Sequence, residues 1–310
     1  MASSFKDLRI VDNFYQTSAF FPMPTLLIST LDEEGNTTMG AYSLCFPYYI
    51  AGKEYYAMIL ECRNSSNTAQ NILRTGKCAI NFLEDGPKDF ASIVKLGFPG
   101  ETSKEKMAKC KFELEPGQAE GVRPLVVKNA FQVFECTWDD SLENAFEDRS
   151  KVGQLEGMEG PYRNFNGVTS KFGCHFILKI DKILMKEKYY DAIINGVKAG
   201  SFPNVPVDYG YRDSTYFWYT RFRRPRKEPI PAGKEMAVDS VIFAANRIDP
   251  EIKFTKDACQ MCVKIPRVFL KAALTQMVDY AREKGWKLID VPQLKEIQDK
   301  RSKEKNQRRR

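Results

Sequence analysis

The chain has one histidine among its 310 residues, and it lacks any long apolar run. A single imidazole excludes histidine-rich metal centres, and we find neither a metal-ligand set nor a serine triad elsewhere. No apolar stretch approaches the ~20 residues that cross a bilayer, because charge or proline interrupts the longest ones. The first residues, Met-Ala-Ser-Ser-Phe-Lys-Asp, contain no basic region followed by an apolar one. We therefore expect no secretory signal, no membrane association and a cytoplasmic location.

What is present is the composition of an ordinary globular protein, with 43% hydrophobic and 28% charged residues. The net charge is +7, but residues 299–310 contain three lysines and four arginines against one aspartate and one glutamate. The basic character thus belongs to a tail, which makes nucleic acid an improbable partner. A second basic stretch, residues 221–227, interleaves arginine with phenylalanine. Such a pattern can bind single-stranded nucleic acid, although a subunit contact or a cover over a ligand is the interpretation we prefer.

Eight cysteines occur, most of them inside apolar runs where a free thiol behaves as a small buried hydrophobe. A chain of this size without a signal sequence is expected to keep them reduced. Cys259 and Cys262 form a lone Cys-x-x-Cys pair. One such pair is half of a zinc site, or a redox dithiol if a helix start lowers one pKa, and chance spacing is the explanation we favour.

Short β-type segments dominate the first two thirds of the chain. An acidic turn at residues 32–36 separates the first two of them. The last predicted strand is expected to bend at Asp181. The segments are 25–30, 37–47, 55–62, 77–82, 124–127, 130–138 and 174–185. With one helix between them, this spacing predicts an antiparallel six-stranded split β-barrel with Greek-key order and flanking helices, over residues 15–220.

The helix within this pattern follows a polar loop of one arginine, hydroxyls and amides, residues 63–68. We expect it to span Ala69–Arg74 and to end at Gly76. A helix start directs free N–H groups and a positive dipole end outward, so a phosphate-bearing cofactor would place its phosphate here. The alternative is simple capping, because Ser, Thr and Asn are preferred N-cap residues with or without a ligand.

Read in order, one set of residues resembles the flavin reductase-like, FMN-binding split-barrel family, which includes flavoredoxins. The resemblance covers residues 1–215. It rests on the order of the motifs, since no single motif is specific to the family. The motifs are Pro22-Met-Pro24, Leu27-Ile-Ser29-Thr30, Gly35, Tyr42-Ser43, Ser66-Asn67-Thr68, Asn71-Ile72, Thr75-Gly76 and Ile80-Asn81.

The resemblance implies FMN as the cofactor and assigns residues to it. Ala41, Tyr42, Ser43 and Leu44 match the segment beside the flavin ring, where small residues permit close approach and Tyr42 packs. Ser65, Ser66, Asn67 and Thr68 form the phosphate loop, where many relatives have Lys-Asp-Thr. The lysine is missing here, and Arg63 is the residue that can supply its charge. His175 matches a family histidine near the flavin and the nicotinamide, although a lone strand histidine is as often structural.

The function that follows is an oxidoreductase of flavin reductase or flavoredoxin type. It would move hydride or electrons between NADH or NADPH and flavin or a downstream acceptor, and it would be a homodimer. The alternative is a non-catalytic flavin-binding or regulatory protein on the same barrel. We expect a barrel domain over residues 1–235, a small helical hairpin over 236–298, and a flexible basic tail over 299–310. The hairpin is predicted from an amphipathic helix over 266–284, stopped by Gly285, and a second helix beginning near Val291.

Overall fold

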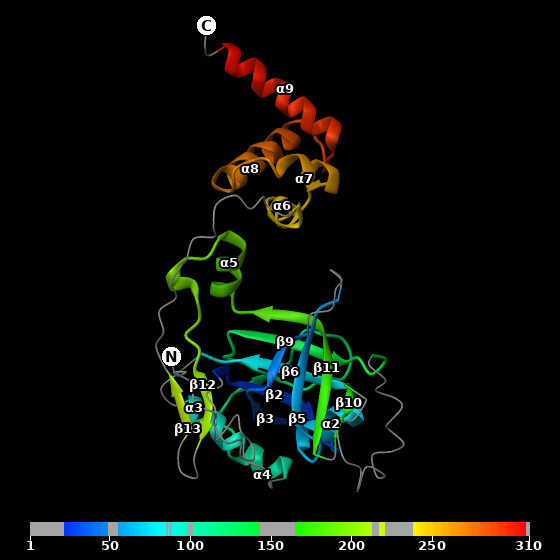
Figure 1. The fold of residues 1–310 in the computed structure, drawn as a ribbon, viewed down its shortest axis with the longest axis vertical. Coiled ribbons are helices and arrows are strands. Elements are labelled where there is room, and N and C mark those ends of the chain that lie inside the picture. Colours follow the sequence, from blue (N-terminus) through cyan, green and yellow to red (C-terminus); the bar gives the residue numbers. More distant parts are fainter. Residues whose placement is uncertain are drawn as a thin grey trace, which may run out of the picture. The chain divides into compact units, whose positions relative to one another are not determined.

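The chain divides into two compact units, Met1–Arg226 and Lys227–Arg310 (Figure 1). The computed structural model describes residues 22–48, 55–84, 86, 89–97, 102–142, 165–170, 172–212, 217–220 and 238–307. Within these ranges, no helix has both the length and the apolar character needed to cross a bilayer. The expected start of the barrel at residue 15 and the expected domain boundary after residue 235 lie outside the described residues.

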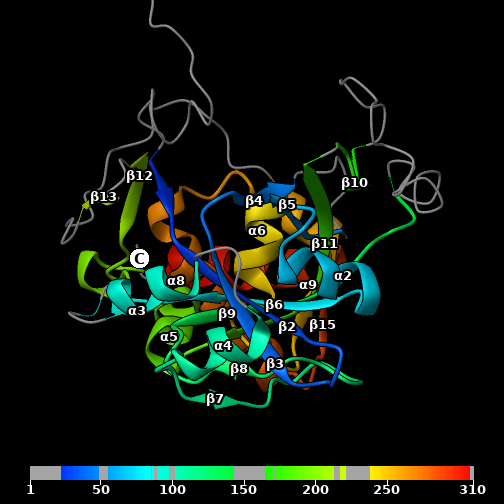
Figure 2. The same ribbon diagram turned by 90° about the horizontal axis from the view of Figure 1, so that it is seen from below.

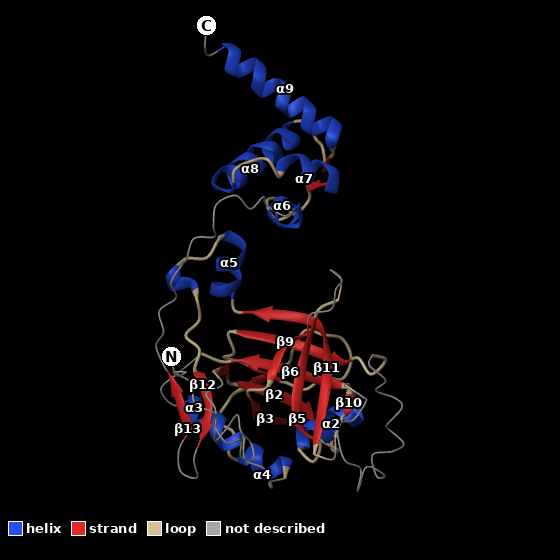
Figure 3. Cartoon of the chain, in the orientation of Figure 1, coloured by secondary structure: helices blue, strands red, loops and turns tan. Residues whose placement is uncertain are grey.

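The first unit is built on one curled antiparallel sheet of eight strands, drawn in red in Figure 3. The strand order is β3-β2-β6-β9-β11-β5-β4, with β10 paired to β11. The strands are β2 (Leu26–Leu31), β3 (Thr37–Tyr42), β4 (Cys45–Tyr48), β5 (Ala57–Arg63), β6 (Lys77–Phe82), β9 (Gln132–Trp138), β10 (Gly167–Val168) and β11 (Gly173–Met185). All the neighbouring pairs in this sheet are antiparallel, as the split-barrel prediction requires.

The two ends of this sheet are consecutive in the chain, and this closes the barrel. β3 and β4 are separated only by Ser43 and Leu44, and β3 pairs with β2 while β4 pairs with β5. The Leu44 carbonyl accepts a hydrogen bond from Glu61 N at 2.9 Å, which ties the bend to β5. The predicted second strand is therefore one bent strand that serves both edges. This bend and the short β10 explain why the sheet counts eight strands where six were predicted.

Local signals in the sequence account for the connections around the sheet. Asp32 Oδ1 accepts hydrogen bonds from the backbone N–H of Glu34 and Asn36, and Gly35 adopts φ 80° in the same turn. Along β11, the register against β9 shifts between Ile180 and Lys182, which confirms the bend predicted at Asp181. The bulge re-aims the strand without ending its pairing.

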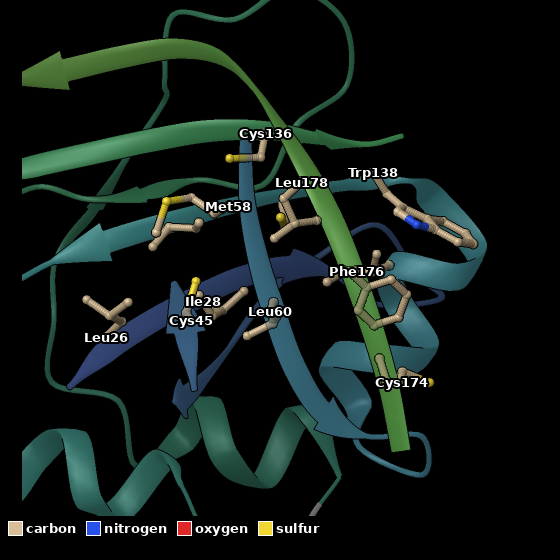
Figure 4. Packing of buried hydrophobic residues seen from close by; sticks show 14 of the residues in the cluster. Leu26, Ile28, Cys45, Met58, Leu60, Cys136, Trp138, Cys174, Phe176 and Leu178 are labelled. Carbon is tan, nitrogen blue, oxygen red and sulfur yellow. The ribbon is translucent and has the colours of Figure 1, made fainter. Parts of the chain in front are cut away.

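Helix α2 (Asn67–Thr75) connects β5 to β6 and closes one end of the barrel. It contacts β2, β3, β5 and β6, and Figure 2 gives a second view of it. Its apolar residues Ala69 and Ile72 are fully buried in the same cluster as Leu60 and Phe176. Figure 4 shows the barrel side chains of this cluster directed toward one another, with Trp138 beside Phe176. The helix is thus part of the barrel core, and its first turn is held by packing.

A second layer covers the outer face of β2, β3, β6 and β9. Helices α3 (Asp89–Leu96) and α4 (Ser103–Ala108) pack on β3. The short strand β7 (Leu114–Glu115) pairs with β8 (Val126–Val127). Ile93 and Leu96 pack with Leu27 and Met39 in a separate buried cluster. A buried side chain, Asn81, links β8 to the sheet. Its Oδ1 accepts a hydrogen bond from Val127 N at 2.8 Å, and its Nδ2 donates to Ser29 Oγ at 2.8 Å.

The remainder of the first unit extends beyond the barrel. α5 (Glu187–Asn195) and the 3-10 turn η2 (Ala199–Ser201) follow β11. β1 (Met23–Pro24), β12 (Val207–Arg212) and β13 (Phe217–Thr220) form a three-stranded sheet. The ring of Tyr219 stacks on that of Phe90, with centroids 3.9 Å apart. The basic stretch at residues 221–227 lies outside the described residues.

The second unit has its own apolar core. Its elements are α6 (Val238–Ala245), β14 (Lys253–Phe254), α7 (Lys256–Cys262), α8 (Arg267–Glu283), β15 (Leu288–Ile289) and α9 (Val291–Gln307). The predicted hairpin corresponds to α8 and α9, and α6, α7 and the parallel β14–β15 pair were not predicted. The tail expected to be flexible from residue 299 is helical as far as Gln307. This helical stretch has a local cause, because lysine, arginine, glutamate and glutamine are good helix formers even without an apolar face.

Candidate functional site

The loop between β5 and α2 has the geometry of a capped helix start. Ser66 is the N-cap residue, and its Oγ accepts a hydrogen bond from Ala69 N at 3.1 Å. Ser66 N donates to the Arg63 carbonyl at 3.0 Å, and Gln70 Nε2 donates to the Asn64 carbonyl at 2.6 Å. At the other end, Gly76 is in the left-handed region at φ 65° and donates to the Ile72 carbonyl. The capping prediction is therefore confirmed, and it leaves open what the outward side of the loop binds.

This loop meets the end of β3, although 24 residues separate the two in the chain. The Tyr42 hydroxyl donates to Ser66 Oγ at 3.3 Å. The Thr68 hydroxyl lies over Gly40, where an added Cβ atom would be 2.9 Å from Thr68 Oγ1. Two of the stretches that carry the family resemblance are thus brought together at the end of the barrel that α2 closes.

The predicted ring-contact residues do not all face the same way. Tyr42 packs against the barrel core, beside Cys62 and Cys174. Ala41 lies on the opposite face of β3 with the second cluster, where Gly97 approaches it. Ser43 and Leu44 form the bend between β3 and β4 and are half-buried. The four side chains therefore do not form a single surface against which a flavin ring could pack. What the four residues share is a continuous stretch of backbone that runs into the bend.

The predicted phosphate-loop residues also differ in direction, since some face the barrel and others are exposed to solvent. Thr68 is 4% exposed, and the Ser66 hydroxyl is turned toward Tyr42. Arg63 and Ser65 are exposed to solvent, and Asn67 is half-buried. The outward side of the loop therefore presents one guanidinium group and one hydroxyl beside the positive end of a helix. This set of donors suits a phosphate monoester.

His175 lies on the outer face of β11, near Arg63. It pairs directly with Glu61 across β5, and Gly173, two residues earlier, pairs with Arg63. Because side chains alternate along a strand and Cys174 faces the core, His175, Glu61 and Arg63 share the outer face. His175 Nε2 is 4.0 Å from Glu61 Oε1, and the Phe165 ring meets the imidazole edge-on at 5.1 Å. Its Nδ1 is buried and makes no hydrogen bond among the described residues.

The thiols near this end of the barrel are unreactive at neutral pH. Burial raises the pKa of Cys174 to about 12 and raises that of Cys62 still further. Burial also raises the pKa of Tyr42 to about 12. These groups therefore stay protonated at neutral pH, and none of them can act as a thiolate or phenolate nucleophile there.

The Cys-x-x-Cys pair lies in the second unit, on α7. Cys259 and Cys262 are buried in its apolar core, and burial raises the pKa of each thiol to about 11. Thr255 caps the start of this helix, since its Oγ1 accepts a hydrogen bond from Ala258 N at 3.2 Å. The redox-dithiol interpretation requires a lowered pKa and is not supported. Among the described residues, no group of three or more His, Cys, Asp or Glu side chains could hold a metal ion.

Two residues of this region were missed by reasoning from sequence. Gly40 leaves the space that Thr68 and the Tyr42 ring fill, and a glycine inside a β-type segment is a recognised sign of close approach. Glu61 is the cross-strand neighbour of His175, which no local pattern reveals, because the pairing joins segments more than 100 residues apart.

No protein-family model and no curated protein matches the sequence. Among solved structures, the chain is similar to a flavoredoxin from Methanosarcina acetivorans, at 17% identity and a TM-score of 0.48, over 74% of this chain and 98% of that one. It is similar to a 2-nitrobenzoate 2-nitroreductase from Pseudomonas fluorescens, at 17% identity and a TM-score of 0.49, over 71% and 91% of the two chains. The flavin reductase of styrene monooxygenase from Pseudomonas putida S12 matches at 11% identity and a TM-score of 0.44, over 69% and 99%.

Proposed function

We propose that the first unit binds FMN and that the protein is a flavin-dependent oxidoreductase of flavin reductase or flavoredoxin type. The observation that carries the proposal is the meeting of Tyr42 with Ser66, and of Gly40 with Thr68, at one barrel end. These contacts join the stretch that resembles the family's ring segment to the stretch that resembles its phosphate loop. Bound FMN would supply the redox chemistry, and the chain's residues would bind and orient it.

The residues present fit the phosphate of FMN. Arg63 supplies an exposed guanidinium group, which suits bidentate contact with phosphate oxygens, and Ser65, two residues later, adds an exposed hydroxyl. The N-terminus of α2 adds its dipole. Ser66 and Thr68 face the barrel and support the loop from inside. We therefore assign direct phosphate contact to Arg63 and Ser65, with Asn67 at the first turn beside them.

Replacing Arg63 by alanine tests the assignment. We expect the affinity for FMN to fall about tenfold or more, because a hydrogen bond to a charged group contributes roughly 1.5–3 kcal/mol. Riboflavin has the same ring without the phosphate, so its affinity should hardly change. Fluorescence quenching on titration of both flavins into both proteins gives the ratio directly.

Lys111→Ala is the matched control, since it removes one positive charge from an exposed position of the same unit outside the loop. It should leave both affinities as they are. Equal losses of FMN and riboflavin in Arg63→Ala would place the phosphate elsewhere. A colourless purified protein that takes up neither flavin would contradict the whole proposal and favour the non-catalytic alternative.

We further propose that His175 contacts the nicotinamide of NADH or NADPH from the outer face that it shares with Glu61 and Arg63. Because the flavin does the redox chemistry, His175 would act by binding and orientation. In His175→Ala we expect the KM for the nicotinamide cofactor to rise several-fold while the affinity for FMN stays constant. Steady-state kinetics with each nicotinamide, beside a flavin titration, checks this. An unchanged KM would leave His175 as a structural residue.

The homodimer and the cytoplasmic location belong to the same proposal. Large side chains are exposed on the first unit, among them Tyr56 at 65% and Phe172 at 73%. A second copy that covers such side chains would account for their exposure. Light scattering at micromolar concentration checks the dimer, and a monomer mass would contradict it.

A further inference from the structure

The Tyr42 side chain connects the barrel core to the start of helix α2. Its ring packs against the barrel core, beside the buried Cys174. Its hydroxyl reaches the helix start instead, where it donates to Ser66 Oγ. The same oxygen accepts from Ala69 N, so one serine joins β3 to the first turn of α2. A hydroxyl oxygen has two lone pairs, and these two bonds use both of them.

The contact between β3 and α2 depends on a missing side chain. A Cβ atom on Gly40 would lie 2.9 Å from Thr68 Oγ1 and 2.9 Å from Tyr42 Cε2. Gly40 therefore lets the Tyr42 ring and the Thr68 hydroxyl pack side by side under the helix. Gly40, Tyr42, Ser66 and Thr68 form one fitted group on the inner side of the loop, whereas Arg63 and Ser65 are exposed to solvent.

We propose that Tyr42 is a positioning residue for the phosphate site. Its hydroxyl holds Ser66, and through Ser66 it holds the start of α2 in the orientation in which Arg63 and Ser65 face the ligand. This inference rests on the proposed function, since it concerns how tightly the same site binds a phosphate group. The phenol can act as donor throughout the usual assay range, because burial raises its pKa to about 12.

The variant Tyr42→Phe removes the hydroxyl and keeps the ring. We expect it to weaken FMN about threefold to tenfold, the loss of one ordinary hydrogen bond, and to leave riboflavin unchanged within about twofold. Riboflavin binding by the same sample shows that the variant is folded. In a Ser66→Ala background, adding Tyr42→Phe should cost much less FMN affinity than it does in the wild type, because the hydroxyl has then lost the serine through which it acts and keeps only its bond to Thr68.

Tyr55→Phe is the control, since the Tyr55 hydroxyl donates to Asp139 Oδ2 at 2.7 Å in another part of the unit. Its removal should change neither flavin affinity. Equal weakening of FMN and riboflavin in Tyr42→Phe would overturn the inference in favour of a ring contact or a general loosening. No change in either affinity, or additive losses with Ser66→Ala, would overturn it as well. A wild-type protein that binds neither flavin would overturn the proposed function and this inference together.

Discussion

Replacing Phe176 by alanine is expected to lower the free energy of unfolding by about 3–5 kcal/mol, the usual cost of deleting a buried aromatic side chain. Phe176 is completely buried in the barrel core, and its ring meets Trp138 at a centroid distance of 5.3 Å in an edge-to-face arrangement. The cavity would open beneath α2, whose residues Ala69 and Ile72 belong to the same cluster. Urea denaturation followed by tryptophan fluorescence measures the loss.

The matched control is Phe202→Ala, in the same unit and 48% exposed. It should change the free energy of unfolding by no more than about 0.5 kcal/mol. Comparable losses of unfolding free energy in the two variants would contradict the close packing of Phe176 in the barrel core. Because the cavity adjoins α2, Phe176→Ala is also expected to weaken the binding of FMN and of riboflavin alike, unlike Arg63→Ala.

Replacing Gly117 by alanine is expected to lower the free energy of unfolding by about 2–4 kcal/mol, although only one methyl group is added. An added Cβ atom would lie 2.1 Å from Glu135 Oε1. Glu135 is 1% exposed, and its Oε2 accepts backbone hydrogen bonds from Gln118 at 2.8 Å and Ala119 at 3.0 Å. Either the loop or the carboxyl group must move, and both buried hydrogen bonds are lost. Thermal and urea unfolding measure the effect.

Two further variants isolate the cause. Gly200→Ala adds the same methyl group where nothing lies within 4 Å, and it should be close to neutral. In a Glu135→Ala background the carboxyl group is absent, so adding Gly117→Ala should cost much less than it does in the wild type. Additive losses in the double variant would show that Glu135 is not what Gly117 has to accommodate.

The elements that could be predicted are those with local signals. The acidic turn before Gly35, the N-cap Ser66 and the left-handed Gly76 each act within a few residues, so the hairpin and α2 were expected where the structure has them. The strand β6 runs over the predicted residues 77–82 for the same reason, because Gly76 ends the helix directly before it. Their order along the chain then sufficed to predict an antiparallel barrel.

The features that escaped prediction depend on contacts between distant segments. Tyr42 faces the barrel core because β3 pairs with β2 in a register that sets Tyr42 opposite the buried Leu26, and this register cannot be read from alternation within one strand. The neighbour of His175 is set by the register of β11 on β5. In the second unit, α6 and α7 have eight and seven residues, too short for a periodic apolar pattern to be distinctive.

The bent strand of β3 and β4 has a consequence for self-association. An open sheet presents two rows of unpaired N–H and C=O groups, which recruit strands from other molecules and begin aggregation. Here the two ends of the sheet are halves of the same strand, and β4 contributes only four residues. An incoming strand would find only the six residues of β3 or the four of β4 to extend, and short edge strands are poor templates. The barrel should thus resist strand-to-strand polymerisation even while it is partly unfolded elsewhere, for as long as the bend at Ser43 and Leu44 holds the two ends together.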